Sequence, residues 1–163
     1  MHRTLADRYF SASHIEHVKP MFEVAWMSFL AGMSAPLQDS NDAEIIHMAL
    51  DGFKNAIKIV CFFGLELERN AFITTLAKFT FLNNFGEMKS KNVETIEALL
   101  DIAHTEGNFL SGSWREILTC VSQLERFQLI SGGVDARTLP ELGRRPSGSV
   151  SRTSANGGRT ATH

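Results

Sequence analysis

Residues 41–64 read NDAEIIHMALDGFKNAIKIVCFFG, and this stretch decides the fold class. Large apolar side chains recur here at spacings of three and four residues, which is the period of one face of an α-helix. They are Ile46, Leu50, Phe53, Ile57 and Val60. Asn41 and Glu44 fit a capping box at the start, and Gly64 suits the C-terminal stop. The pattern predicts an amphipathic helix over residues 41–63.

The same period recurs on both sides of this stretch. It predicts further helices over residues 18–38, 66–84, 89–106 and 113–130. The last has the clearest start, because Ser113 and Glu116 stand at the spacing of a second capping box. Short connections make neighbouring helices antiparallel, and each hairpin is roughly 43 residues long, as in HEAT or armadillo repeats. We therefore predict an all-α fold of antiparallel helical hairpins, an α-solenoid fragment rather than a closed bundle.

The composition changes at both ends of this helical region. Residues 132–163 are rich in Ser, Arg and Gly and poor in large apolar side chains, a composition that does not offset the entropy cost of ordering. We expect a frayed N-terminus over residues 1–12, a helical-repeat domain over 13–131 and a disordered tail over 132–163.

Overall composition excludes several classes of protein. The 163 residues are 44% hydrophobic, and 16 basic against 18 acidic residues give a net charge of −2. A nucleic-acid-binding domain usually carries a basic excess, so no nucleic-acid partner is expected. The longest apolar run, residues 59–65, is far short of the roughly 20 residues that span a bilayer. Two cysteines form no disulfide framework, which favours a reducing compartment, the cytosol or the nucleus, and we expect a cytoplasmic location.

A search for catalytic chemistry finds no strong motif. His14 with His17, and His47 with Asp51, have spacings seen in metal sites, yet ordinary surface pairs explain both better. Cys61 and Cys120 lie in apolar helical patterns. Cys61 stands between Val60 and Phe62, which favours a buried, inert thiol, and Cys120 lies outside the first helical turn, where the helix dipole would activate a thiol. Neither a nucleophile elbow nor a phosphate-binding glycine loop is present in the sequence. We expect no enzyme activity and no metal or other cofactor.

The connection over residues 106–114 is the candidate binding site. It places Phe109 and Trp114 on either side of two serines and a glycine, just before the last predicted helix. One interpretation is a structural turn, in which Phe109 packs on the next helix and Trp114 lies between the hairpins. The other is a partner-binding corner made by Asn108, Phe109 and Trp114, since Trp is enriched in binding hot spots.

In the C-terminal tail, the sequence Arg144-Arg145-Pro146-Ser147 resembles a site for a basophilic kinase. Phosphorylation of Ser147 would add about −1.5 to −2 charge to a basic segment. Ser147 is therefore a candidate modification site.

Several separated stretches, in order, resemble one known family. They are residues 17–22 with Trp26, residues 68–72, residues 88–92, and above all Gly107-Asn108-Phe109-Leu110 with residues 113–120. Over roughly residues 10–133 the chain resembles the large Sec-seven-type guanine-nucleotide exchange factors for Arf GTPases, the brefeldin A-inhibited group. The resemblance is to the first homology region downstream of the catalytic domain.

This resemblance implies an α-helical repeat segment with a role in regulation and recruitment. In that family the region is tied to binding GTP-loaded Arf at trans-Golgi and endosomal membranes. The catalytic exchange domain has no counterpart in these residues, so we expect a non-catalytic segment that meets the membrane only peripherally, through the GTPase. The alternative is a purely structural repeat that needs neighbouring repeats of the full-length exchange factor. Direct attachment by an amphipathic helix is disfavoured, because the polar faces of the helices after the first are mostly acidic.

Overall fold

The computed structural model describes residues 12–82 and 88–133, and they form a helical fold without strands. The five α-helices are α1 (Val18–Asp39), α2 (Ala43–Phe63), α3 (Glu66–Lys78), α4 (Ser90–Glu106) and α5 (Trp114–Ser131). Three short 3₁₀ turns accompany them, η1 (Ile15–His17), η2 (Gly107–Phe109) and η3 (Ser111–Ser113). The prediction of an all-α fold is confirmed.

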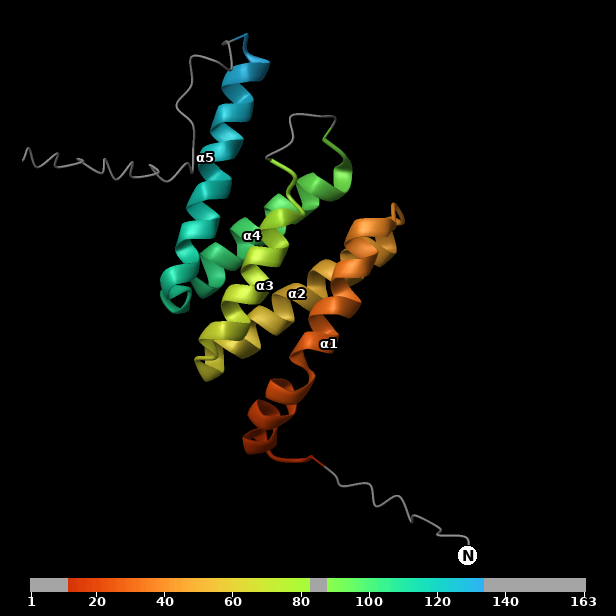
Figure 1. The fold of residues 1–163 in the computed structure, drawn as a ribbon, viewed down its shortest axis with the longest axis vertical. Coiled ribbons are helices and arrows are strands. Elements are labelled where there is room, and N and C mark those ends of the chain that lie inside the picture. Colours follow the sequence, from red (N-terminus) through yellow and green to blue (C-terminus); the bar gives the residue numbers. More distant parts are fainter. Residues whose placement is uncertain (1–11, 83–87, 134–163) are drawn as a thin grey trace, which may run out of the picture.

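The helices stack as layers. Each helix contacts the next one in the chain from α1 to α5, and α1, α2 and α3 also contact the next helix but one, namely α3, α4 and α5. Figure 1 shows α1 and α5 at opposite edges of the molecule. A closed bundle would bring the first and last helices together, so this arrangement is that of helical hairpins in an open stack.

The hydrophobic core is centred on α2, α3 and α4, because these helices have neighbours on several sides. The most deeply buried large apolar side chains are at most 1% exposed. They are Phe53, Ile57 and Val60 on α2, Phe72, Ile73 and Leu76 on α3, Leu99 on α4, Leu110 just before η3 and Ile117 on α5. The apolar stripe read from residues 46–60 is thus the main face of the core. Burying each large apolar side chain contributes about 1.5–3 kcal/mol.

Helix boundaries differ from the sequence expectation at the starts of α2 and α5 and at the end of α3. The cap of α2 is Asp42 rather than Asn41, because the Asp42 carboxylate accepts hydrogen bonds from the backbone amides of Glu44 at 2.9 Å and Ile45 at 3.4 Å. The other end of α2 is as predicted, since Gly64 adopts φ +64°. That left-handed conformation is costly for any side chain with a Cβ atom.

Helix α3 ends at Lys78, not at residue 84 as predicted. The Thr80 hydroxyl donates a 2.7 Å hydrogen bond to the carbonyl of Ala77, and Phe81 adopts φ +53°. A threonine hydroxyl that bonds to nearby backbone competes with continuation of the helix. Within residues 12–82 and 88–133, no helix combines the length and hydropathy that a bilayer-spanning segment requires.

Candidate functional site

The candidate site is the corner between α4 and α5, where two 3₁₀ turns replace the loop that the sequence suggested. Three side-chain hydrogen bonds hold this corner. The indole Nε1 of Trp114 donates to the carbonyl of Gly107 at 2.9 Å. Arg69 Nη1, from α3, donates to the carbonyl of Phe109 at 3.0 Å, and the Ser113 hydroxyl donates to Asn70 Oδ1 at 2.6 Å. The corner is therefore fixed both to itself and to α3.

The predicted capping box at Ser113 is wrong, because the Ser113 hydroxyl bonds to Asn70 instead. Ser113 precedes α5, but its side chain makes no hydrogen bond to the start of that helix. The residue is buried and already has helical backbone angles, φ −69° and ψ −14°. A capping residue normally has extended angles, so the hydroxyl turns to α3 instead. Ser113 links two helices rather than starting one.

Trp114 has a structural position. Its ring is partly buried and packs against the core, and a Cβ atom at Gly107 would lie 3.2 Å from its Cζ2 atom. This close approach, together with the Nε1 hydrogen bond, fixes the indole against the backbone of η2. For Trp114, the structural interpretation describes the packing.

The side chains of Asn108 and Phe109, unlike that of Trp114, are exposed to solvent. Asn108 is exposed, and Phe109 is 57% exposed although its carbonyl is held by Arg69. The structure thus fixes the backbone at Phe109 while leaving its ring accessible. The three predicted residues lie in one corner, but only Asn108 and Phe109 have exposed side chains.

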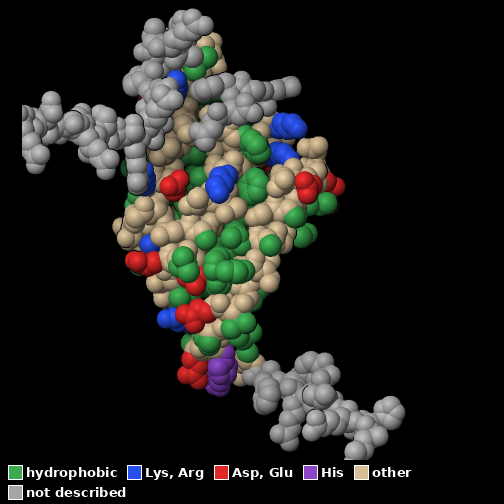
Figure 2. Space-filling model, in the orientation of Figure 1, with side chains coloured by type: hydrophobic (Ala, Val, Ile, Leu, Met, Phe, Trp, Pro, Cys, Tyr) green, Lys and Arg blue, Asp and Glu red, His purple; other side chains and the backbone are tan. Residues whose placement is uncertain are grey.

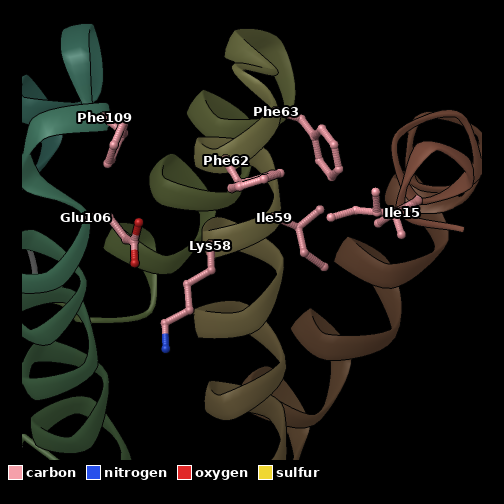
Figure 3. Close-up of a pocket in the computed structure, with 8 residues that line it drawn as sticks. Ile15, Lys58, Ile59, Phe62, Phe63, Glu106 and Phe109 are labelled. Carbon is pink, nitrogen blue, oxygen red and sulfur yellow. The ribbon is translucent and has the colours of Figure 1, made fainter.

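The Phe109 ring lines a groove of about 700 Å³ between the corner, the end of α2 and the start of α1. The remaining lining residues are Ile15, Val18, Lys58, Ile59, Phe62, Phe63 and Glu106. Figure 3 shows Ile59 and Phe62 in the middle, with Ile15 on one side and Glu106 with Phe109 on the other. Lys58 and Glu106 are the only charged residues among the lining residues. The groove is therefore apolar with one charge of each sign at its margin.

Phe109 is the one groove residue that the sequence indicated as a binding candidate, and Phe62 is the most exposed aromatic residue among those it missed. Phe62 is 71% exposed and lies two residues after Val60, which places it on the opposite face of α2 from the core stripe. That off-stripe position was the signal available in the sequence.

A second apolar cavity of about 350 Å³, between α1 and α2, shares Ile59 with the groove. Figure 2 shows a group of hydrophobic side chains at the surface near the middle of the face that it presents.

Cys61 is buried, as predicted, and so is Cys120. Burial raises the pKa of the Cys61 thiol to about 11, and the charge of Glu106 acts in the same direction. Burial also raises the pKa of Cys120, although its 3.4 Å hydrogen bond to the Thr80 hydroxyl opposes this. A nucleophilic cysteine requires a lowered pKa, so neither thiol is activated.

The histidine pairs lack the surroundings of a metal site. His47 Nε2 lies 3.4 Å from Asp51 Oδ2 in an exposed pair on one helix face, and the rings of His14 and His17 meet edge to face at 5.7 Å. In the described part of the chain, no group of three His, Cys, Asp or Glu side chains could hold a metal ion. Ser147, the candidate phosphorylation site, lies outside the described residues.

Comparison with known proteins supplies the family. No family model matches the chain, and no solved structure matches it. Among curated proteins, the chain is 50% identical over 136 residues to the ADP-ribosylation factor guanine nucleotide-exchange factor sec71 of Schizosaccharomyces pombe, a match that covers 83% of this chain. It is 48% identical over 146 residues, 88% of this chain, to the human brefeldin A-inhibited guanine nucleotide-exchange protein 1.

A third relative, the exchange factor SEC7 of Saccharomyces cerevisiae, is 46% identical over 136 residues, 83% of this chain. The chain spans only 7–8% of the length of these three relatives. Identity near one half over more than four fifths of the chain shows common descent for this segment. The chain belongs to the family of large ADP-ribosylation factor guanine nucleotide-exchange factors, and it corresponds to one short segment of them.

Proposed function

We propose that this chain is a non-catalytic regulatory segment that binds activated, GTP-loaded Arf and helps to recruit the exchange factor to Golgi membranes during vesicle trafficking. The relatives are named as exchange factors for ADP-ribosylation factor or as brefeldin A-inhibited exchange proteins. That naming supports an Arf GTPase as the partner. In this proposal the chain acts in the cytoplasm and reaches trans-Golgi or endosomal membranes peripherally, through the lipid-anchored GTPase.

The observation that carries the proposal is the exposed aromatic groove beside the corner. Phe62 and Phe109 are both more than half exposed, while the backbone under Phe109 is held by Arg69. Exposed aromatic rings on a rigid backbone are the usual anchors of protein interfaces, because they bury large areas at little entropic cost. Lys58 and Glu106 can pair with charges at the rim of a partner.

The proposal is tested with lipid-anchored Arf on liposomes, loaded with a GTP analogue or with GDP. We expect the chain to sediment with the GTP-analogue form and not with the GDP form. Phe109→Ala and Phe62→Ala should each weaken binding about 5- to 30-fold, as expected for the loss of an interface anchor worth roughly 1–2 kcal/mol. Met48→Ala is the matched control, since Met48 is an equally exposed apolar residue of α2 that does not line the groove.

The outer face of α1 favours a second candidate, a structural repeat that packs on neighbouring repeats of a full-length exchange factor. Met21, Val24 and Met27 follow one another at helical spacing and are 56%, 87% and 66% exposed. The terminal helix of a solenoid normally has a polar outer face. An apolar one is suited to covering by a further helix.

The two candidates separate by self-association. The structural candidate predicts concentration-dependent oligomers of the chain in sedimentation velocity, which Val24→Lys abolishes, together with no Arf binding in either nucleotide state. The regulatory candidate predicts that Val24→Lys leaves GTP-dependent binding unchanged, because Val24 does not line the groove.

A further inference from the structure

The residues with which the described chain begins form one side of the groove beside Phe109. They are Ile15 in η1 and Val18 in the first turn of α1. Glu106 and Phe109 lie on the other side, with Phe62 between the two sides (Figure 3). An exposed aromatic surface of this kind in water is costly, because apolar area gains about 25 cal/mol for each Å² that is covered. A segment of the chain that starts beside the groove is the nearest source of cover.

Residues 1–11 are such a segment, and they join the described chain at Ala12. Phe10 is five residues before Ile15, and a fully extended chain advances about 3.3–3.6 Å per residue. Phe10 can therefore reach up to roughly 17 Å from Ile15, which is itself a lining residue of the groove. The tether is long enough to bring residues 5–10 across the groove.

The sequence of this segment complements the groove. Leu5, Tyr9 and Phe10 offer one aliphatic and two aromatic side chains, which suit a surface made by Ile, Val and Phe. Between them, Asp7 and Arg8 carry one charge of each sign, and the groove carries Lys58 and Glu106. Pairing of Asp7 with Lys58 and of Arg8 with Glu106 would give each charged residue of the groove a partner of opposite charge.

We propose that residues 5–10 of this chain bind in the groove lined by Ile15, Phe62, Phe63 and Phe109, with Tyr9 and Phe10 as the anchors. Tethering gives the segment an effective concentration in the millimolar range, so even a weak contact is well populated. The segment then covers the same rings that the proposed GTPase contact uses, and a partner has to displace it. The binding of residues 5–10 itself does not depend on that proposed function.

The C-terminal tail is a poorer occupant on geometric grounds. It leaves the described chain after Gly133, at the end of α5, whereas the groove lies at the start of α5 and the start of α1. Figure 1 places these two ends of the fold far apart, at the top and the bottom of the view. A helix of 18 residues separates them by about 27 Å. Residues 134–163 begin a full helix length further from the groove than residues 1–11 do.

NMR relaxation of the uniformly ¹⁵N-labelled full chain, without any GTPase, tests the proposal. We expect backbone order parameters of residues 5–10 near 0.8, the range of rigid backbone, against values below about 0.6 for a free segment. The double variant Tyr9→Ser with Phe10→Ser should release residues 5–8 and shift the amide resonances of Lys58, Phe62 and Phe109. Leu142→Ser is the matched control, an apolar-to-serine change in the other terminal segment, and should leave those three resonances in place.

A groove-side variant makes the test independent of changes in the segment itself. Phe62→Ser removes an exposed ring and should also lower the order parameters of residues 5–10. The proposal is overturned if residues 5–10 have order parameters below about 0.6 in the unmodified chain, or if the double variant leaves the groove amides unshifted. Order that increases with protein concentration would identify a second copy as the occupant and would also overturn it.

Discussion

The hydroxyl of Ser113 donates a 2.6 Å hydrogen bond to the side-chain oxygen of Asn70, and this contact joins the start of α5 to α3 across 43 positions of sequence. Ser113 is 4% exposed, so its hydroxyl has little access to water. Together with the Arg69 bond to the Phe109 carbonyl, the contact fixes the corner that carries the groove. The position of the Phe109 ring therefore depends on α3.

Ser113→Ala tests whether the hydroxyl links two helices or caps one. We expect a loss of about 1 kcal/mol in the free energy of unfolding, since one buried hydrogen bond is removed. A double-mutant cycle with Asn70→Ala should show a coupling energy of about 0.5–1.5 kcal/mol. Urea denaturation of the four proteins supplies the measurement. A coupling near zero, combined with a large coupling between Ser113 and Glu116, would restore the capping box.

Trp114→Phe separates packing from hydrogen bonding at the corner. The variant keeps an aromatic ring but leaves the Gly107 carbonyl without the indole donor, which should cost about 0.5–1.5 kcal/mol. Gly107→Ala should also destabilise, because the new Cβ atom would lie 3.2 Å from the indole. Thermal denaturation measures the stability of both variants.

Phe109→Ala should change the stability of the chain little, because the Phe109 ring is mostly exposed. Thermal denaturation measures this too, and a large loss of stability would contradict the orientation of the ring.

Two glycine substitutions should act in opposite directions. Gly64→Ala forces an alanine into φ +64° and should destabilise the chain by about 1 kcal/mol, although no atom lies within 4 Å of the added Cβ. Gly32→Ala lies inside α1, also with open space around the Cβ, and should stabilise by up to about 1 kcal/mol through helix propensity. Urea midpoints compare the two, and equal signs would contradict the assigned backbone conformations.

Stability should depend on pH through Cys61. The pKa of its thiol is about 11 in the folded chain, above the value near 8.5 of a free thiol. The neutral thiol is thus favoured by folding, so its contribution is fully present below about pH 8.5 and is lost as the pH rises towards 11. The difference in unfolding free energy between the native chain and Cys61→Ala should therefore shrink over this range. A difference that grows with pH would show that the folded state holds the thiolate.

Helical periodicity predicted the fold well, because the core stripe of α2 is buried as a continuous face. The spacing of Phe53, Ile57 and Val60 determines which face of α2 packs against α3 and α4. Helix ends were predicted less well, since they depend on single side chains. Asp42 competes with Asn41 for the same amides, and the Thr80 hydroxyl ends α3 early.

Contacts between distant segments could not be predicted from the sequence. Lys91 has the position of a solvent-facing residue in the pattern of α4, yet it is buried. Its ammonium group donates to the carbonyls of Gln38 at 3.1 Å and Ser40 at 2.9 Å, at the end of α1. The candidate site shows the same limit. The sequence indicated the corner at Phe109, but only folding brings the end of α2 and the start of α1 beside it.

The nucleotide dependence of binding to lipid-anchored Arf on liposomes tests the proposed GTPase contact most directly. Residues 1–163 are mixed with liposomes that carry Arf loaded with a GTP analogue, with GDP, or with no Arf at all. We predict sedimentation of the chain with the GTP-analogue form only, weakened about 5- to 30-fold in Phe109→Ala and kept in Met48→Ala. Equal binding to both nucleotide forms, or binding that Phe109→Ala leaves intact, would contradict the proposed contact.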